Sequence, residues 1–250
     1  MAIKFKAVLK EPDILKESIN TVANLLNEGV FNLTKTGIEL KSMDSANVAM
    51  VELKLLASAF TEFEVKENTK ISLNMNDLTS VLKRTKSDDI LTLKLEGNAL
   101  NLEFAGSVNR KFEVPLLDIR DESKSPSLEF PATVEVKTSV IEDGISDAEI
   151  ISDAVVLEMD PDSFVMRAEG DSRKAEMRLE KGSDALISLK AKDHVKSTFP
   201  LDYMRKMIKG SKMANTAILH MGNDYPMKLE FKVIDKALLS FILAPRIENE

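Results

Sequence analysis

Apolar residues recur along the chain at two spacings, and the spacing changes where turn-forming residues stand. Ile3, Phe5 and Ala7 alternate with polar residues, which predicts an opening strand. Pro12 and Asp13 are helix start signals, and apolar residues three or four apart follow them, which predicts a helix. Further strands are expected at residues 30–33, 37–42, 48–55, 70–73, 91–95 and 99–104, with a short helix at residues 76–85.

The second half of the chain repeats the apolar pattern of the first half. A shift of about 126 residues places apolar positions on apolar positions in the same order: Leu15 on Ile141, Ile38 on Phe164, Leu78 on Met204 and Leu82 on Ile208. The repeat predicts two tandem copies of one β-rich α+β domain, residues 1–116 and 131–250, with two helices in each copy. The second pair of helices is expected at residues 139–151 and 201–209. Residues 117–130 are polar, charged and interrupted by proline, which is typical of a linker.

The composition is that of a globular protein, and it excludes several kinds of site. Of 250 residues, 44% are hydrophobic and 30% are charged, and there is no cysteine. The lack of cysteine excludes a disulfide scaffold, a zinc–thiolate site, an iron–sulfur cluster and a cysteine nucleophile. No apolar run approaches the roughly 18–20 residues of a membrane span, and the N-terminus has no signal-peptide pattern. We therefore expect an intracellular protein without a membrane partner, a cofactor or a metal.

The charged residues are unevenly distributed. The 34 basic and 41 acidic residues give a net charge of −7, which by itself argues against nucleic-acid binding. The short helix of each copy is nevertheless basic on its polar face. Cations at helix C-termini complement the helix dipole, but a basic strip on an acidic body also suits sequence-independent contact with phosphates, and both interpretations remain open. The basic residues on the predicted helices and their ends are Lys16, Lys83, Arg84, Lys86, Arg205, Lys206 and Lys209.

The helix predicted at residues 139–151 is acidic instead. Because it contains Glu142, Asp143, Asp147 and Glu149, it contributes little to phosphate binding. Two interpretations are equally open for this helix. It is a solvent-exposed face, or it contacts basic residues of a neighbouring subunit.

No catalytic constellation stands out. His194 and His220 have no serine and aspartate at spacings that suggest a catalytic triad, and P-loop, G-x-G-x-x-G and H-E-x-x-H motifs are absent. We expect no enzymatic activity. The alternative from another class is an enzyme of two similar halves with its site at their junction.

Two segments are more specific than the pattern around them. Residues 42–48 read Ser-Met-Asp-Ser-Ala-Asn-Val, and residues 243–250 read Leu-Ala-Pro-Arg-Ile-Glu-Asn-Glu. Both resemble motifs of the proliferating cell nuclear antigen (PCNA) family of DNA sliding clamps, and the duplicated domain, the linker position and the length agree with that family. The absence of cysteine and tryptophan is similar to archaeal members.

The resemblance implies a homotrimeric ring with the DNA clamp fold, in which helices line a hole that encircles duplex DNA. Such a ring acts as a processivity factor for DNA polymerase, is loaded by a clamp loader, and also docks flap endonuclease and DNA ligase. A subunit of a heterotrimeric clamp is the alternative. The expected location is the cytoplasm and nucleoid of an archaeon, or the nucleus of a eukaryote. On this resemblance the seven basic residues named above face the DNA.

The resemblance also implies two protein-binding regions. Client proteins of the family insert a short peptide, the PIP box, into an apolar pocket, and edge strands pair between subunits. The edge strands here are expected at residues 108–116 and 172–181. The positions that match the peptide pocket are Met43, Asn47, Val48, Met50, Leu128, Pro226, Ile242, Leu243, Ala244 and Pro245. The candidate residues of the subunit interface are Arg110, Lys111, Asp143, Asp147, Arg173, Lys174 and Met177.

Overall fold

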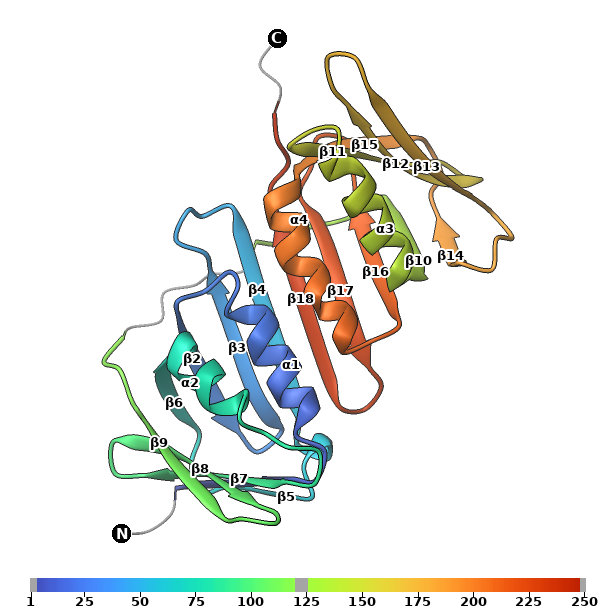
Figure 1. Cartoon of the computed structure of the whole chain (residues 1–250). Coiled ribbons are helices and arrows are strands. Elements are labelled where there is room, and N and C mark those ends of the chain that lie inside the picture. Colours follow the sequence, from blue (N-terminus) through green and yellow to red (C-terminus); the bar gives the residue numbers. More distant parts are fainter. Residues whose placement is uncertain (1–3, 120–125, 248–250) are drawn as a thin grey trace. The chain divides into compact units, whose positions relative to one another are not determined.

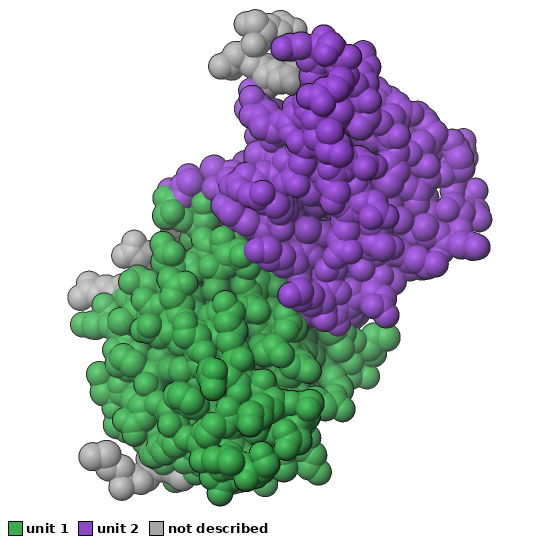
Figure 2. Space-filling view, viewed as in Figure 1, with its two compact units in different colours: residues 1–45, 51–124, 233–239 green, residues 46–50, 125–232, 240–250 purple. Residues whose placement is uncertain are grey.

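The computed structural model describes residues 4–119 and 126–247, which form two compact units (Figure 2). Unit 1 comprises residues 1–45, 51–124 and 233–239, and unit 2 comprises residues 46–50, 125–232 and 240–250. Two strands, β4 (Ala49–Leu56) and β18 (Ala237–Leu243), contribute residues to both units. The division of the chain at residues 117–130 stays a prediction, and residues 120–125 of that linker lie outside the described part of the chain.

Unit 1 combines two antiparallel arrays of strands with a pair of helices. One sheet has the strand order β5-β1-β7-β8-β9, and a second run has the order β4-β3-β2-β6. Helices α1 (Asp13–Val22) and α2 (Met75–Leu82) pack against each other over the second run (Figure 1). The remaining elements are β1 (Phe5–Leu9), β2 (Glu28–Thr34), β3 (Gly37–Met43), the 3₁₀ turn η1 (Ala57–Ala59), β5 (Glu62–Val65), β6 (Thr69–Asn74), β7 (Ile90–Glu96), β8 (Ala99–Ala105) and β9 (Arg110–Pro115).

Unit 2 repeats this plan. Its strands run in the orders β14-β10-β16-β17-β18 and β13-β12-β11-β15. Helices α3 (Thr138–Glu149) and α4 (Leu201–Met207) pack against each other over the first of these runs (Figure 1). The predicted class, an α+β fold of two β-rich copies with two helices each, is therefore confirmed. The other elements are β10 (Ala132–Lys137), β11 (Ala154–Met159), β12 (Ser163–Glu169), β13 (Lys174–Glu180), β14 (Leu186–Lys190), β15 (Val195–Pro200), the 3₁₀ turn η2 (Ile208–Lys212), β16 (Thr216–Met221) and β17 (Met227–Val233).

The helices form where the apolar spacing predicts them. In α1, Leu15, Ile19 and Val22 are buried at spacings of three and four, as the sequence pattern requires. In α2 the Asn74 side chain caps the helix, because its Oδ1 accepts the backbone N–H groups of Asn76 at 2.9 Å and of Asp77 at 3.1 Å. The cap therefore fixes where α2 begins.

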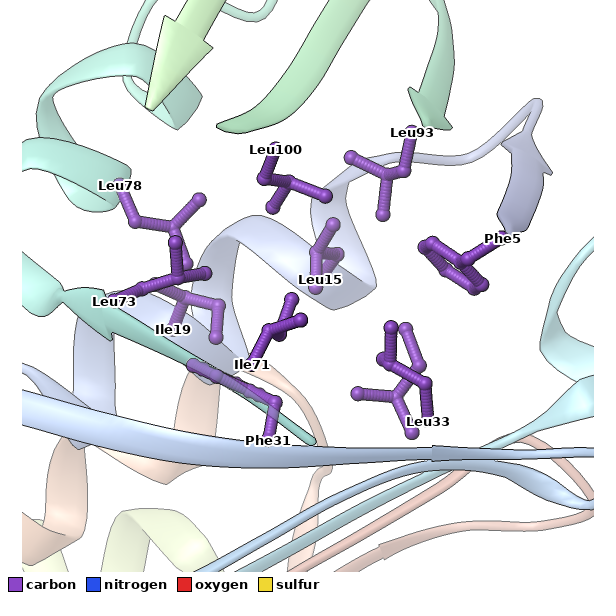
Figure 3. A pocket seen from close by; sticks show the side chains of 11 residues that line it. Phe5, Leu15, Ile19, Phe31, Leu33, Ile71, Leu73, Leu78, Leu93 and Leu100 are labelled. Carbon is purple, nitrogen blue, oxygen red and sulfur yellow. The ribbon is translucent and has the colours of Figure 1, made fainter. Parts of the chain in front are cut away.

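The core of unit 1 contains a small apolar cavity of about 30 Å³ (Figure 3). Phe5, Phe31 and Leu33 from strands face Leu15 and Ile19 from α1 across it. Ligand pockets usually measure about 300–1,000 Å³ and carry convergent polar groups. This cavity is therefore a packing defect of the core and no binding site.

Two details differ from the sequence pattern, and one expectation falls outside the described residues. Strand β5 and the turn η1 were not expected, although Phe63 and Val65 alternate with glutamates in β5 and so carry a strand signal. The helix expected at 201–209 ends at Met207 and continues as the 3₁₀ turn η2. Ile3, expected in the opening strand, lies outside the described residues.

Candidate DNA-facing helices, peptide site and subunit edges

The loop that follows α2, residues 83–88, is a basic segment in which all three cations are exposed; we call it the α2 loop. Leu78 and Leu82 bury the apolar side of α2. Lys83, Arg84 and Lys86 are exposed, and none of the three forms an ion pair within the described residues. Their charges are therefore available to an anion outside the chain.

A buried carboxylate closes the α2 loop. Asp89 is 2% exposed, and its Oδ2 accepts the backbone N–H of Lys86 at 2.7 Å and pairs with the Arg110 guanidinium from β9. Burial raises the pKa of Asp89, but the hydrogen bonds from Lys86 and Arg110 outweigh burial, so the net pKa lies below the usual range. The carboxylate is thus held ionised.

The basic face of α4 is partly neutralised from within. Leu201, Met204 and Ile208 are buried, which confirms the predicted stripe. On the opposite face Asp202 accepts hydrogen bonds from Arg205 at 3.0 Å and Lys206 at 2.7 Å. The hydrogen bond from Lys206 is the main reason why the pKa of Asp202 is lowered.

Two further candidates have acidic neighbours. Arg205 also lies 3.6 Å from Glu149 of α3. The Lys16 ammonium lies 2.6 Å from Asp13 and 3.6 Å from Glu17, and the hydrogen bond to Asp13 raises its pKa. Lys16 is half-buried, so it projects less than the α2 loop does. Lys209 is exposed in η2.

Helix α3 presents its acids to solvent. Glu142, Asp143 and Asp147 are exposed, and within the described part of the chain they form no ion pair. The other side of α3 packs closely, because a Cβ at Gly144 would stand 2.6 Å from Met166 Sδ and 2.8 Å from Met177 Cε. Met177 of β13, a candidate interface residue, is thereby half-covered by α3.

Two positions of the expected peptide site meet in unit 2. The Ala244 N–H donates to the Val48 carbonyl at 3.0 Å, and Asn47 before it adopts a left-handed φ of 57°. Arg246 holds the following segment, since its N–H donates to Thr198 O at 2.7 Å. The motif at residues 42–48 and the motif at the C-terminal end are therefore in direct contact.

The other positions of the peptide site differ in their accessibility. Met50 is 2% exposed and Leu243 is 0% exposed, so neither offers surface to a peptide, and any role for them is indirect. Met43 belongs to unit 1. The convergence of the full set stays a prediction. The half-buried members are Met43, Val48, Leu128, Pro226, Ile242, Ala244 and Pro245.

A cluster of aromatic and polar side chains was not expected, and one of its members, Tyr225, directly precedes Pro226. The Phe130 ring lies 5.6 Å from His220 and 5.9 Å from Tyr225. The His220 ring bonds to Thr133 Oγ1 at 2.9 Å and to Glu230 Oε2 at 3.1 Å. Burial raises the pKa of Glu230, but hydrogen bonds from His220 and Lys228 lower it to about 2. His220 lies in β16 between β10 and β17 and is half-buried, so it is not at an edge of the sheet.

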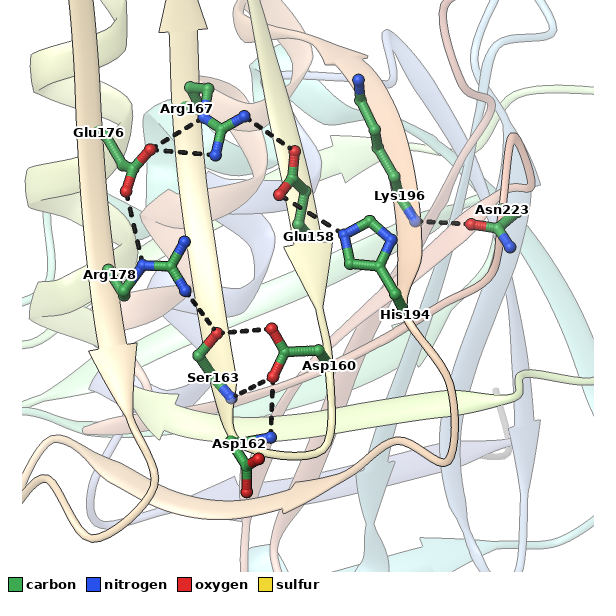
Figure 4. Close-up of polar contacts among 10 residues, drawn as sticks. All are labelled: Glu158, Asp160, Asp162, Ser163, Arg167, Glu176, Arg178, His194, Lys196 and Asn223. Atoms are coloured by element: carbon green, nitrogen blue, oxygen red, sulfur yellow. Dashed lines mark hydrogen bonds and ion pairs between the residues drawn. The ribbon is translucent and has the colours of Figure 1, made fainter.

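Strand β13 is an edge of its sheet and is stiffened by a ladder of ion pairs (Figure 4). Arg167 of β12 joins Glu158 of β11 at 3.3 Å and Glu176 of β13 at 3.0 Å. Arg178 continues the ladder to Glu176 and to Ser163 Oγ. The edge predicted at 172–181 is present, and its candidates Arg173 and Lys174 are exposed.

Strand β9 forms the corresponding edge of unit 1, where 108–116 was predicted. Lys111 is half-exposed and lies 3.9 Å from Glu113. Arg110 is engaged inside its own unit, and its Nε is buried without a hydrogen-bond partner among the described residues. The interface role of Arg110 stays a prediction, with its charge already shared with Asp89.

No metal or membrane site is apparent in the part of the chain that is described. Within residues 4–119 and 126–247, no three His, Asp or Glu side chains gather as metal ligands would. Within the same ranges, no helix has both the length and the apolar character that crossing a membrane requires.

The duplicated unit, with a helix pair over one run of strands and a second sheet, defines the DNA clamp fold. A crystal structure of PCNA from Thermococcus kodakaraensis matches with a TM-score of 0.92 and 26% identity, over 97% of this chain and 100% of that chain. The family models for the PCNA N-terminal and C-terminal domains match residues 4–121 and 124–246. The chain therefore belongs to the proliferating cell nuclear antigen family, whose members are non-enzymatic processivity factors.

Curated relatives support the same family. DNA polymerase sliding clamp 1 of Thermococcus kodakarensis is 35% identical over 98% of this chain and 99% of the relative. The DNA polymerase sliding clamp of Pyrococcus furiosus is 34% identical over the same shares. Both relatives are archaeal, as the resemblance implied.

Sequence reasoning missed three groups that shape these surfaces: Asp89, Asp202 and the His220 cluster. Asp88 and Asp89 were visible as an acidic pair in a turn, but only the fold shows which of the two is buried. Asp202 stands three and four residues before two cations, a spacing that predicts helical ion pairs. The contacts of His220 involve residues of three strands, so no local sequence pattern predicts them.

Proposed function

We propose that this chain is a subunit of a homotrimeric sliding clamp that encircles duplex DNA and holds a DNA polymerase on it. The observation that carries this proposal is the pair of basic helix ends on an otherwise acidic chain of the PCNA family. The cations of the α2 loop form no ion pair within the described residues, and a repeated basic strip suits weak phosphate contact without base reading. Weak contacts permit sliding, because topological enclosure and not affinity retains the ring.

The second half of the proposal concerns client proteins. The contact between Val48 and Ala244, with half-buried Ile242 and Pro245 nearby in the chain, supports a docking site for PIP-box peptides of DNA polymerase, flap endonuclease and DNA ligase. The half-exposed apolar side chains suit a groove that adapts to several partners. The clamp loader is the further partner that a closed ring requires.

The subunit joint is proposed to form between the edge strands β9 and β13. Both strands leave backbone groups unpaired on one side, an arrangement that stable proteins cover. In this proposal the exposed Asp143 and Asp147 face basic residues of the neighbouring subunit across the joint. Of the two candidates on β9, Lys111 is more accessible than Arg110, which pairs with Asp89. A head-to-tail contact of unlike edges closes into a ring when its rotation fits.

Sedimentation equilibrium tests the assembly. A homotrimer has a mass of about 83 kDa, three times the 27.8 kDa of the chain. A monomer or dimer at all concentrations contradicts the homotrimer and favours the alternative, a subunit of a heterotrimeric clamp. Dissociation in high salt supports ion pairs at the joint.

A primer-extension assay on singly primed circular DNA tests the function. We expect longer products from a cognate polymerase and loader when the protein is present. A variant with Lys83, Arg84 and Lys86 changed to glutamate should keep its mass and lose the stimulation. Unchanged product lengths with this variant would place the DNA elsewhere.

A further inference from the structure

Asp89 is a buried carboxylate for which the proposed function has so far given no role. An ionised group removed from water is stable only with close partners, and those of Asp89 come from two separate segments. The backbone N–H of Lys86 lies in the α2 loop, and the guanidinium of Arg110 lies in β9. The carboxylate therefore joins the loop to the edge strand of its sheet (α2 and β9 in Figure 1).

Arg110 holds the loop at a second point. One of its amino groups donates to the Arg84 carbonyl at 2.7 Å, while the guanidinium lies 5.1 Å from the centre of the Phe104 ring. The Asp89 N–H also donates back to Lys86 O at 3.2 Å. One side chain of β9 thus fixes both the start and the end of the α2 loop.

The surroundings leave Asp89 little freedom. A Cβ at Gly106 would stand 2.6 Å from Asp89 Oδ1, so the turn after β8 closes directly over the carboxylate. The neighbouring Asp88 is exposed and forms no ion pair within the described residues. Two adjacent aspartates consequently carry the same charge but differ in burial and in their contacts.

We propose that Asp89 and Arg110 are positioning residues, which hold the α2 loop so that Lys83, Arg84 and Lys86 present their charges to DNA in a fixed arrangement. The inference rests on the proposed function, because it presumes that these three cations contact DNA. It also reassigns Arg110, whose guanidinium serves the loop of its own subunit.

The direction in which one substitution changes DNA affinity separates positioning from simple electrostatics. Asp89→Asn removes a negative charge, and long-range electrostatics alone predicts tighter binding of DNA. Positioning predicts weaker binding, because the freed loop spreads its cations over many arrangements. Asp88→Asn is the matched control, since it makes the same charge change next to Asp89 without touching the anchor.

The test uses the full-length protein and a fluorescently labelled duplex at low salt, with anisotropy as the readout and hydrogen exchange of the α2 loop measured in parallel. We expect Asp89→Asn to weaken binding by about threefold or more, the effect of losing at least one phosphate contact, and to speed exchange at the Lys86 amide. Asp88→Asn should bind DNA as tightly as the parent or more tightly. Unchanged or tighter binding by Asp89→Asn overturns the inference.

Two further variants keep the outcomes distinct. Arg110→Lys retains the charge but has one donor group where arginine has several, so it should lose affinity partly with little change in melting temperature; full affinity would overturn the inference even if Asp89→Asn failed to fold. A variant with Lys83, Arg84 and Lys86 changed to glutamine tests the premise. If that triple variant binds as the parent does, the DNA-facing assignment fails; if it binds weakly while Asp89→Asn does not, only the inference fails.

Discussion

Neutralising the α2 loop should flatten the salt dependence of DNA binding, and the expected size follows from the contacts. The change is Lys83, Arg84 and Lys86 to glutamine in every subunit. Each phosphate contact contributes about 0.9 to the slope of log affinity against log salt. Between about 50 and 200 mM salt, a fourfold range, one lost contact thus removes about 3.5-fold from the fall in affinity. The upper bound per subunit is three contacts.

The same change on α4 should matter less. Arg205 and Lys206 already share their charge with Asp202, and Arg205 also approaches Glu149, so changing both cations to glutamine removes less available charge than changing two cations of the α2 loop. The difference between the two variants measures the screening by Asp202. Equal slopes for the two variants would show that the internal ion pairs open freely on DNA.

The assay is fluorescence anisotropy of a labelled duplex over a series of salt concentrations. The matched control changes three exposed lysines outside the helix ends, Lys35, Lys66 and Lys70, to glutamine. The control alters net charge equally and should leave the slope nearly unchanged. If the control and the α2-loop variant flatten the slope alike, the protein binds through its general charge and the α2-loop assignment is wrong.

Four further substitutions have defined outcomes. The pKa of Glu230 is about 2 in the folded protein against an ordinary 4.5, so its contribution to stability is full above about pH 4.5 and is lost as the pH falls towards 2. In Glu230→Gln the melting temperature should therefore depend less on pH between about 4.5 and 2 than in the parent. Gly210→Ala should destabilise by about 1–3 kcal/mol in thermal unfolding, because a Cβ there would stand 2.5 Å from the buried Phe231 ring, and an unchanged melting temperature would show that the ring yields. Met50→Ala should lower the free energy of unfolding by about 2–5 kcal/mol in chemical denaturation, because Met50 is buried. Val48→Ala should instead weaken the binding of a PIP-box peptide measured by calorimetry, and undiminished binding would show that the pocket assignment is wrong.

The fold was largely predictable because its signals are local and repeated. The spacing of Leu15, Ile19 and Val22 determines one helix face, and the same spacing recurs in the second half, so two weak patterns support each other. Strand β5 was missed although Phe63 and Val65 alternate there, because its four residues give too short a period to separate from a turn-rich loop.

The site was only partly predictable, for a different physical reason. Lys83 and Arg84 directly follow Leu82, the last buried position of α2, so their exposure at the helix end could be expected from the sequence. The burial of Asp89 depends on Arg110, which is distant in sequence and pairs with it only once β9 has joined β8. Ion pairs of this kind depend on strand order, so the sequence alone does not show which of the adjacent residues Asp88 and Asp89 is the buried partner of Arg110.

The charge distribution bears on how the proposed clamp would slide. Asp202 and Glu149 screen α4, the acids of α3 remain exposed, and the cations of the α2 loop form no ion pair with the described part of the chain. Strong attraction to phosphate is therefore confined to a few points of each subunit. A continuous basic lining would hold many phosphates at once, and each step along the duplex would break many contacts together. A few contacts, each weakened by salt, break and re-form singly. An acidic subunit with isolated basic loops is therefore consistent with a ring that moves along DNA.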